Sequence, residues 1–188
     1  APRMSNRGPR AWRARTPYGA GVTLSEPRVG TTPAWVVSFH QLGITIRDDH
    51  GAVLAELPAR EGAPVMVGDW SARRVVLTGV STVHAMDADG RTAFDLPLGD
   101  FAFSQALTVR LTPGASTSVA ILAAAPRDLR RWRIILLAPD ATTIYDEVLE
   151  TPAHLLKVPV SDGRETLLVA GRGLRAIRPL AVARSPTS

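Results

Sequence analysis

The sequence predicts an all-β protein built from repeated short antiparallel strands. Three observations lead to this prediction: apolar residues that alternate with polar ones, frequent turn residues, and the lack of a sustained helical period. The 188 residues include 15 Gly and 15 Pro, which is typical of many short elements joined by turns. The best helical segment, 145–157, contains Pro152, and a proline there would interrupt a helix.

Individual strands are recognised by their apolar pattern. Leu107, Val109 and Leu111 alternate with polar residues, as expected for a strand with one buried face. Residues 134–137 are all aliphatic, as expected for a strand covered on both faces. These patterns predict four groups of strands: 35–40, 43–48 and 52–57; 64–69, 74–80, 82–87 and 92–96; 106–112, 118–124, 133–138 and 143–149; 153–160, 166–170 and 174–180.

The groups recur at a spacing of about 40 residues with about four strands each, which is the spacing of propeller blades. Gly51 and Gly90 end corresponding turns and lie 39 residues apart. Residues 44–57, a strand followed by an Asp-rich turn and an Ala/Leu-rich strand, resemble a β-propeller blade. The pattern is similar to the broad PQQ-like and WD40-like superfamilies and extends loosely over residues 23–180. It implies a β-propeller-like fold of about four blades, or a partial propeller, with a β-sandwich as the alternative.

The family pattern is incomplete in this chain. Asp140 is not followed by Gly, and the Asp-Gly pair at 162–163 falls at a different point of the last group. That group also lacks an outer strand, which residues 12–16 or another chain would supply. The predicted organisation is a basic arm at 1–21, an all-β repeat domain at 22–182 and a tail at 183–188. Propellers of this kind mostly act as interaction platforms, and a few bind cofactors.

The net charge of +5 is concentrated at one end of the chain. Residues 1–30 contain six Arg and one Glu, and the remaining basic and acidic residues cancel. Because all but one of the basic residues are Arg, the high pI is more easily explained by a GC-rich coding sequence than by nucleic-acid binding. An arm of this charge is suited to bind an acidic groove on a protein or an anionic membrane face, with nucleic acid as a third option. The alternative is a disordered terminus without a role. The candidate partner-binding residues of the arm are Arg3, Arg7, Arg10, Arg13 and Arg15.

A second basic cluster lies in the repeat domain. Arg127, Arg130 and Arg131 surround Trp132, and arginines interleaved with an aromatic ring can clamp a phosphate or stack on a base. The favoured alternative is a solvated loop that enters a strand, with Trp132 packed on the sheet and Asp128 partly neutralising the charge. Trp12, Trp35 and Trp70 are likewise expected to be core or blade-edge residues and not a ligand cage.

No catalytic or metal-binding signature stands out. The chain has no Cys, which excludes disulfides and thiolate sites. The sequence Asp87-Ala88-Asp89-Gly90 resembles the start of a calcium loop but lacks the later Glu, and a hairpin turn is favoured. Residues 171–176 mimic a dinucleotide fingerprint, but Pro179 would end the helix that such a site needs, so a hairpin turn is predicted there instead. The histidines form no metal-binding spacing; they are His40, His50, His84 and His154.

These observations favour a non-enzymatic interaction or scaffolding subunit that docks on a larger protein assembly, with a membrane surface as a further contact. We expect no cofactor, no metal and no nucleic-acid partner. Two alternatives stay open: a ligand- or glycan-binding module, and a hydrolase or lyase with a loop-built site at His50, His84, Asp87 and Asp89. The longest apolar run, 119–125, is too short for a transmembrane helix. The compartment stays open, with the cytoplasm or a membrane periphery favoured.

Overall fold

The computed structural model describes residues 21–24, 35–40, 43–48, 50–58, 63–71, 73–114, 116–160 and 162–177. These residues form 15 strands and no helix. Every strand pair is antiparallel, so the predicted fold class is confirmed. The chain divides into two compact units, residues 1–61 and residues 62–188, and each unit is described by itself.

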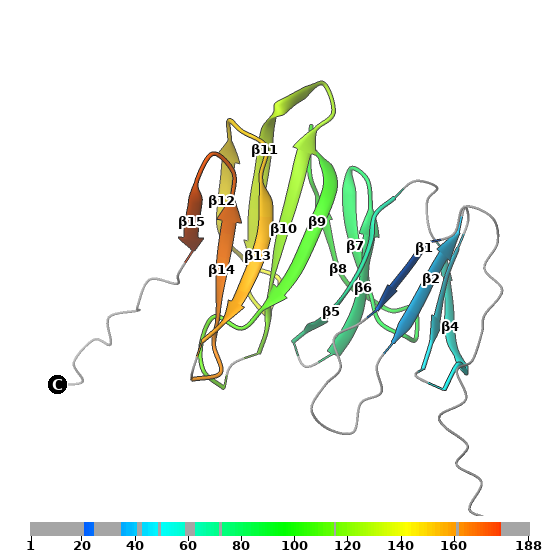
Figure 1. The fold of residues 1–188 in the computed structure, drawn as a ribbon. Coiled ribbons are helices and arrows are strands. Elements are labelled where there is room, and N and C mark those ends of the chain that lie inside the picture. The colour runs from blue at the N-terminus through cyan, green and yellow to red at the C-terminus, as the bar shows by residue number, and fades with distance from the viewer. Residues whose placement is uncertain are drawn as a thin grey trace, which may run out of the picture. The chain divides into compact units, whose positions relative to one another are not determined.

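The first unit contains one sheet, in which neighbours in sequence are neighbours in space (Figure 1). Its strands are β1 (Gly21–Leu24), β2 (Val36–His40), β3 (Gly43–Arg47) and β4 (Val53–Pro58). One face is apolar and buried, through Val37, Ile44 and Ile46. The opposite face carries Thr45 and Glu56, which lie across from each other on β3 and β4. A sheet with this alternation has one covered and one polar face.

The second unit contains three sheets, and in Figure 1 the β9–β12 sheet lies between the β13–β15 sheet on its left and the β5–β8 sheet on its right. The first comprises β5 (Val65–Trp70), β6 (Arg73–Gly79), β7 (Thr82–Met86) and β8 (Thr92–Pro97). The second comprises β9 (Ala102–Val109), β10 (Ser118–Ala125), β11 (Asp128–Leu137) and β12 (Thr143–Leu149). The third comprises β13 (His154–Pro159), β14 (Glu165–Ala170) and β15 (Leu174–Ile177). Each sheet is a meander in which the strands follow one another in order, as in a propeller blade.

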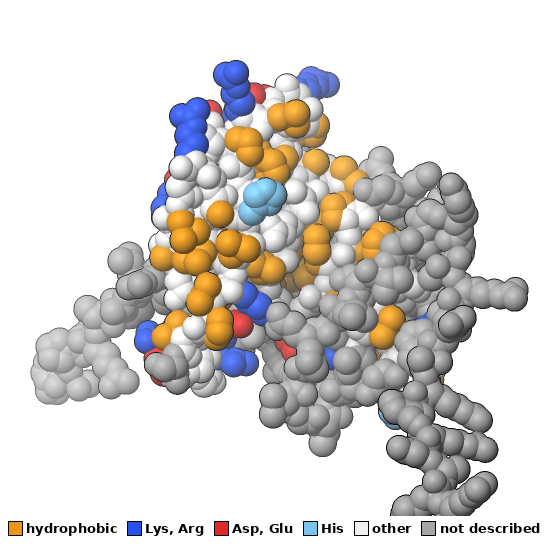
Figure 2. Space-filling view, viewed as in Figure 1, with side chains coloured by type: hydrophobic (Ala, Val, Ile, Leu, Met, Phe, Trp, Pro, Cys, Tyr) orange, Lys and Arg blue, Asp and Glu red, His pale blue; other side chains and the backbone are white. Residues whose placement is uncertain are grey.

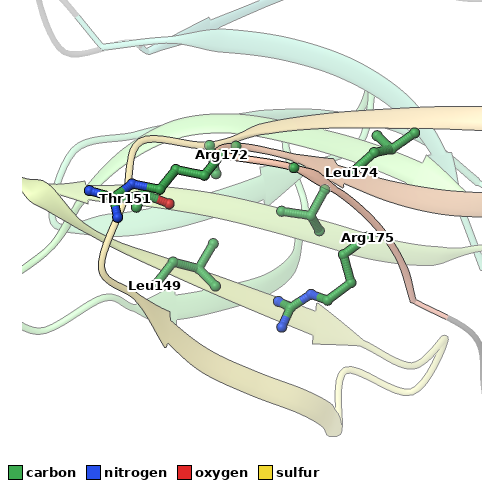
Figure 3. Close-up of a pocket in the computed structure, with 9 residues that line it drawn as sticks. Leu149, Thr151, Arg172, Leu174 and Arg175 are labelled. Atoms are coloured by element: carbon green, nitrogen blue, oxygen red, sulfur yellow. The ribbon is translucent and has the colours of Figure 1, made fainter.

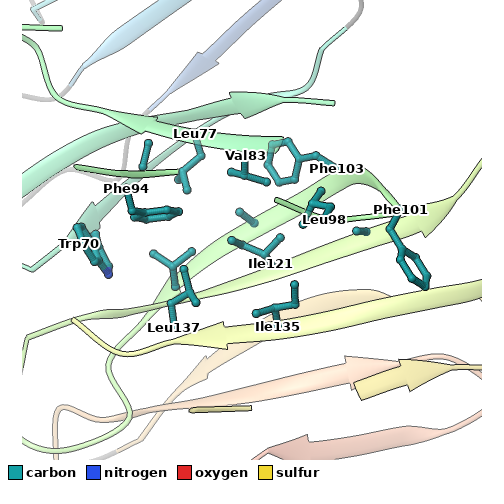
Figure 4. Packing of buried hydrophobic residues seen from close by; sticks show 14 of the residues in the cluster. Trp70, Leu77, Val83, Phe94, Leu98, Phe101, Phe103, Ile121, Ile135 and Leu137 are labelled. Atoms are coloured by element: carbon teal, nitrogen blue, oxygen red, sulfur yellow. The ribbon is translucent and has the colours of Figure 1, made fainter. Parts of the chain in front are cut away.

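The β5–β8 and β9–β12 sheets pack face to face through a continuous aliphatic and aromatic core (Figure 4). Leu77 and Val83 from the first sheet meet Ile121, Ile135 and Leu137 from the second. Trp70 and Phe94 close one end of this core, with their ring centroids 5.0 Å apart in an edge-to-face arrangement. Burying side chains of this size provides about 1.5–3 kcal/mol each before the entropy cost of ordering them.

The opposite face of the β9–β12 sheet packs on the β13–β15 sheet. Its second core contains Leu122, Ile134, Leu155, Leu167 and Val169. The solid aliphatic runs of β10 and β11 are therefore explained by a sheet that is covered on both faces. The central position of the β9–β12 sheet follows from this double burial.

The last two sheets are joined near β9 and β13 by separate hydrogen bonds that form no continuous backbone ladder. The amide nitrogen of Gln105 donates to the carbonyl of Leu155, and the amide oxygen of Gln105 accepts from the N–H of the same residue, both at 2.9 Å. Glu165 and Arg110 exchange two further bonds, with the backbone N–H of Glu165 donating to the Arg110 carbonyl at 2.6 Å and the Glu165 carboxylate accepting from the Arg110 N–H at 2.8 Å. The ammonium group of Lys157 donates to the Thr108 carbonyl at 3.2 Å.

One tight turn recurs in all four sheets, at residues 48–52, 87–91, 138–142 and 160–164. In each, the first residue donates its N–H to the carbonyl of the fifth and accepts from the N–H of the fourth. The fourth residue has a positive φ in every case, and it is Gly51, Gly90, Ala141 or Gly163. A type I turn followed by a left-handed residue explains this geometry. The last turn connects β13 to β14, whereas the other three connect third strands to fourth strands, as the sequence pattern suggested.

Three strands differ from those expected. Strand β1 was not predicted; it completes the first sheet, and its first residue, Gly21, was assigned to the arm. Strand β9 spans Ala102–Val109 instead of 106–112. Strand β11 begins at Asp128 instead of Arg133, because the hairpin with β10 extends through exposed polar residues that carry no apolar period. The proposed closing strand at 12–16 lies outside the described residues, as does the tail at 183–188.

Candidate interaction surface

The last sheet presents one apolar face to solvent, which we call the outer face. Leu156 and Val158 on β13 and Leu174 on β15 point to it, because their strand neighbours Leu155 and Ile177 face the second core. Figure 2 shows hydrophobic side chains gathered over these strands. The residues of the outer face are His154, Leu156, Val158, Thr166, Leu168, Ala170, Leu174 and Ala176.

Three large apolar side chains of this face are exposed to solvent. Leu156, Val158 and Leu174 are 48%, 46% and 66% exposed. In the β9–β12 sheet, by contrast, β10 is buried on both faces, although Ile144 and Val148 on β12 are 52% and 42% exposed. Contiguous exposed apolar residues on a soluble protein mark a surface that binds something. The outer face is therefore the first candidate for a docking surface.

A hydrogen-bonded triad lies beside this face, between the last two sheets. The guanidinium of Arg175 on β15 donates to both oxygens of Glu147 on β12, at 2.9 and 2.7 Å. The hydroxyl of Tyr145 donates to the same carboxylate. The bond from Arg175 lowers the pKa of Glu147, whereas burial and the bond to Glu147 raise the pKa of Tyr145. The ion pair between Arg175 and Glu147 therefore links β15 to the neighbouring sheet, and Tyr145 adds a hydrogen bond to the same carboxylate.

An open pocket of about 280 Å³ lies next to the triad, at the turn between β14 and β15 (Figure 3). Leu149 and Leu174 provide apolar walls, and Arg172 and Arg175 provide positive charge. Arg172 is exposed. The turn itself is the Gly171–Gly173 hairpin that the sequence predicted in place of a dinucleotide site, with the Gly171 N–H bonded to the Gly173 carbonyl at 2.8 Å.

The basic cluster around Trp132 forms the hairpin between β10 and β11. The Trp132 ring packs against the second core and its indole N–H donates to the Leu129 carbonyl at 2.9 Å, which confirms that it packs on the sheet. Arg131 lies over the Phe101 ring, with its guanidinium carbon 5.7 Å from the ring centroid. Arg127 and Arg130 are exposed. This hairpin is a second solvated basic surface.

Arg133 follows in the same strand and is structural. It donates to both carboxylate oxygens of Asp146 on β12, at 2.9 and 2.6 Å, and to the Leu98 carbonyl at 3.2 Å. These bonds lower the pKa of Asp146 and raise the pKa of Arg133. A two-pronged arginine–carboxylate pair holds a fixed geometry, so this pair joins the third and fourth strands of its sheet.

The positions of His50, His84, Asp87 and Asp89 do not favour the hydrolase or lyase alternative. Asp87 uses one carboxylate oxygen to accept from the N–H groups of Asp89 and Arg91, both at 2.9 Å, as expected for a hairpin turn. His84 pairs with Asp95 at 2.7 Å on an exposed sheet face. Among the described residues, no group of three or more His, Asp or Glu side chains is placed to hold a metal ion. His50 is exposed and lies in the other unit.

Sequence reasoning located some of these features and missed others. Trp35 and Trp70 are buried, as predicted for core residues. Arg3, Arg7, Arg10, Arg13 and Arg15 lie outside the described residues, as do Trp12 and residues 13–16. The outer face and the Arg175–Glu147 pair were not anticipated. The one available signal was that Leu155 and Leu156 are adjacent apolar residues in a strand, which places one of them on each face.

Comparisons with known proteins give a distant likeness only. No protein-family model and no curated protein matches the sequence. A protein of unknown function from Bacteroides caccae is similar at 12% identity and a TM-score of 0.49, over 85% of this chain and 56% of that one. BBS1N crystallised in complex with ARL6DN is similar at 13% identity, in one crystal with a TM-score of 0.46 over 89% of this chain and 68% of that one, and in another with 0.45 over 87% and 61%.

The chain thus spans between about half and about two thirds of the length of these structures. At such scores the likeness carries no inference about activity or partners. None of the described residues forms a long apolar helix of the kind that crosses a membrane.

Proposed function

We propose that this chain is a non-enzymatic interaction module that docks on a protein partner within a larger assembly. The observation that supports the proposal most strongly is the outer face of the last sheet. It places Leu156, Val158 and Leu174 in solvent on a rigid β-sheet whose opposite face is a packed core. Apolar residues on a rigid surface bind with little loss of conformational entropy.

The chemistry of the described residues also favours docking over catalysis. The strongly bonded polar groups join strands to each other, as Arg133 does with Asp146 and Arg175 does with Glu147. The pocket beside β15 offers two arginines and apolar walls but no paired acid and base for proton transfer. A docking surface needs only apolar and charged side chains at the surface, and the pocket provides both.

The test compares two variants matched in exposure. Leu156→Ser/Val158→Ser removes apolar side chains of the outer face that are 48% and 46% exposed, and Val53→Ser/Leu54→Ser removes side chains of the first unit that are 49% and 44% exposed. Each tagged protein is returned to its native cell and its bound proteins are identified. We expect one or more proteins bound by the wild type and the control to be lost from the outer-face variant. Equal recovery with both variants, or an isolated wild-type monomer, would contradict the proposal.

The basic arm provides a second, electrostatic contribution in this proposal. Its charge would attract an acidic groove or an anionic membrane face, and screening by salt weakens such attraction between exposed charges. Purification at low and at high salt separates the two contributions, because apolar docking on the outer face persists at high salt. Replacement of the five arm arginines by Gln should abolish only the salt-sensitive part of the binding.

A further inference from the structure

The edge of β15 that faces away from β14 lies beside both the outer face and the pocket. Strands β7 and β11, which are the third strands of their sheets, pair on both sides. Strand β15 is also the third strand of its sheet, and among the described residues it pairs with β14 only. Unpaired N–H and C=O groups along such an edge form a ready template for another strand.

The two complete sheets of the second unit show what a fourth strand provides. On β8, Phe94 enters the core with the following sheet, and the adjacent Asp95 points to the other face and pairs with His84 of the third strand. On β12, Tyr145 packs on the following core, and the adjacent Asp146 points to the other face and pairs with Arg133 of the third strand. The fourth strands of these two sheets, β8 and β12, therefore each contain an aromatic residue followed by an aspartate, whereas β4 of the first unit has Ala55 followed by Glu56.

Arg175 occupies the corresponding place in the last sheet. It lies on the third strand, and it shares a face with Ile177, which packs toward the preceding sheet. His84 and Arg133 also lie on third strands and on the face opposite the one that meets the following sheet. Arg175 pairs with Glu147 on β12 of the neighbouring sheet. His84 and Arg133, by contrast, each pair with an aspartate of their own sheet.

We propose that β15 accepts an extended strand of the partner protein, in which an aromatic residue is followed directly by an acidic residue. This inference rests on the proposed function and names the kind of segment that docks. Neighbouring residues of a strand point to opposite faces. The acidic side chain therefore reaches the Arg175 and Arg172 guanidinium groups beside the pocket, and the aromatic ring extends the outer face next to Leu174. Charge complementarity selects the acid, because the exposed Arg172 adds a positive charge at this edge beside Arg175, which is already paired with Glu147.

A peptide of known strand character provides the probe. Residues 91–97 of this chain, Arg-Thr-Ala-Phe-Asp-Leu-Pro, contain the pattern and form a fourth strand in the β5–β8 sheet. Hydrogen exchange of the β15 amides is measured with and without this peptide at millimolar concentration. We expect the peptide to slow the exchange of the outward-facing amides of β15. The same peptide with Phe→Ser or with Asp→Arg should bind roughly tenfold more weakly.

A charge exchange then tests the role of Arg175. Arg175→Glu should reject the original peptide and accept the Asp→Arg peptide, whereas Arg175→Gln should bind both weakly. Circular dichroism establishes that each variant is folded. Binding of the original peptide that is unchanged in Arg175→Glu would overturn the pairing with Arg175.

Three other results would overturn the inference as a whole. These are no protection of β15 by the peptide, β15 amides that are already protected in the free chain, and self-association of the chain through β15. Each leaves the proposed function intact if the outer-face variant still loses its partner. Conversely, if the outer-face variant keeps every partner of the wild type, the proposed function fails whatever the peptide does.

Discussion

Single residues in the recurring turn explain how the chain reverses direction. The fourth residue of each turn has a positive φ, which Gly adopts without strain and other residues adopt at a cost of about 1–2 kcal/mol. Ala141 is in this conformation at 67°, where the other three turns have Gly. The side chain of Ala141 packs partly against the first core, which offsets part of the strain.

A pair of substitutions tests this explanation. Ala141→Gly should stabilise the protein by up to about 1 kcal/mol, and Gly90→Ala, at a φ of 75°, should destabilise it by about 1 kcal/mol. Urea denaturation of both variants and the wild type measures the two free energies of unfolding. Destabilisation by Ala141→Gly would show that methyl packing outweighs backbone strain at this turn.

The Arg133–Asp146 pair makes stability depend on pH at the acidic end. Because the bond from Arg133 lowers the pKa of Asp146 in the folded state, the unfolded chain binds a proton at a higher pH than the folded chain does. The stabilisation is fully present above the unfolded pKa and is lost as the pH falls through the folded one. The urea midpoint should therefore fall as the pH is lowered from about 5 to about 3.

Asp146→Asn provides the control for this dependence. The variant should be less stable than the wild type near neutral pH and should lose less stability on acidification. Asp140, Glu147 and Asp162 also have lowered pKa values, so some acid sensitivity should remain. An identical pH profile in Asp146→Asn and the wild type would contradict a stabilising role for the pair.

At the scale of elements, the last two sheets are held together by an apolar core and by Gln105. Its side chain satisfies both backbone groups of Leu155 on the edge of β13 that faces β9. Gln105→Met keeps the length of the side chain but leaves both of those groups without a partner. The expected loss is about 1–3 kcal/mol in urea denaturation, and Gln105→Glu, which keeps one acceptor, should lose less. Unchanged stability in Gln105→Met would indicate that water makes the two hydrogen bonds to Leu155 in place of the amide.

Strands β5 and β9 approach closely at Gly68. A Cβ atom built at Gly68 would lie 2.4 Å from a methyl carbon of Thr108. Gly68→Ala should therefore destabilise the protein by about 1–3 kcal/mol. The double variant Gly68→Ala/Thr108→Ser, which removes the opposing methyl group, should recover most of this loss. If the double variant is as unstable as Gly68→Ala, the loss of stability arises from the backbone of β5 and not from the contact with Thr108.

Most of these elements could be predicted from the sequence because strand signals are local. Alternation over a few residues and a bounding Asp, Gly or Pro located β3, β7 and β14 within one residue at each end. The start of β11 was missed because its first four residues are exposed and carry no apolar pattern. The outer face was missed for a different reason, since whether a sheet face is covered depends on sheets far away in the sequence. The Arg175–Glu147 pair likewise joins residues 28 positions apart.

At the scale of the whole molecule, the chain repeats one structural unit and leaves the last copy exposed. In the second unit, each interface between successive sheets is an apolar core of the same kind. The outer face of the β13–β15 sheet has the composition of such an interface, but Leu156, Val158 and Leu174 are in solvent. Docking of a protein partner on this face would bury those residues in the way the preceding sheets bury theirs.

A footprint on the native assembly tests this central claim most directly. The protein is purified from its native source together with its partner, and hydrogen exchange is compared between the assembly and the free chain. The account predicts that protection is strongest along β13, β14 and β15, which carry the outer face. Protection confined to other segments, such as the β10–β11 hairpin, or no protection of the last sheet, would contradict it.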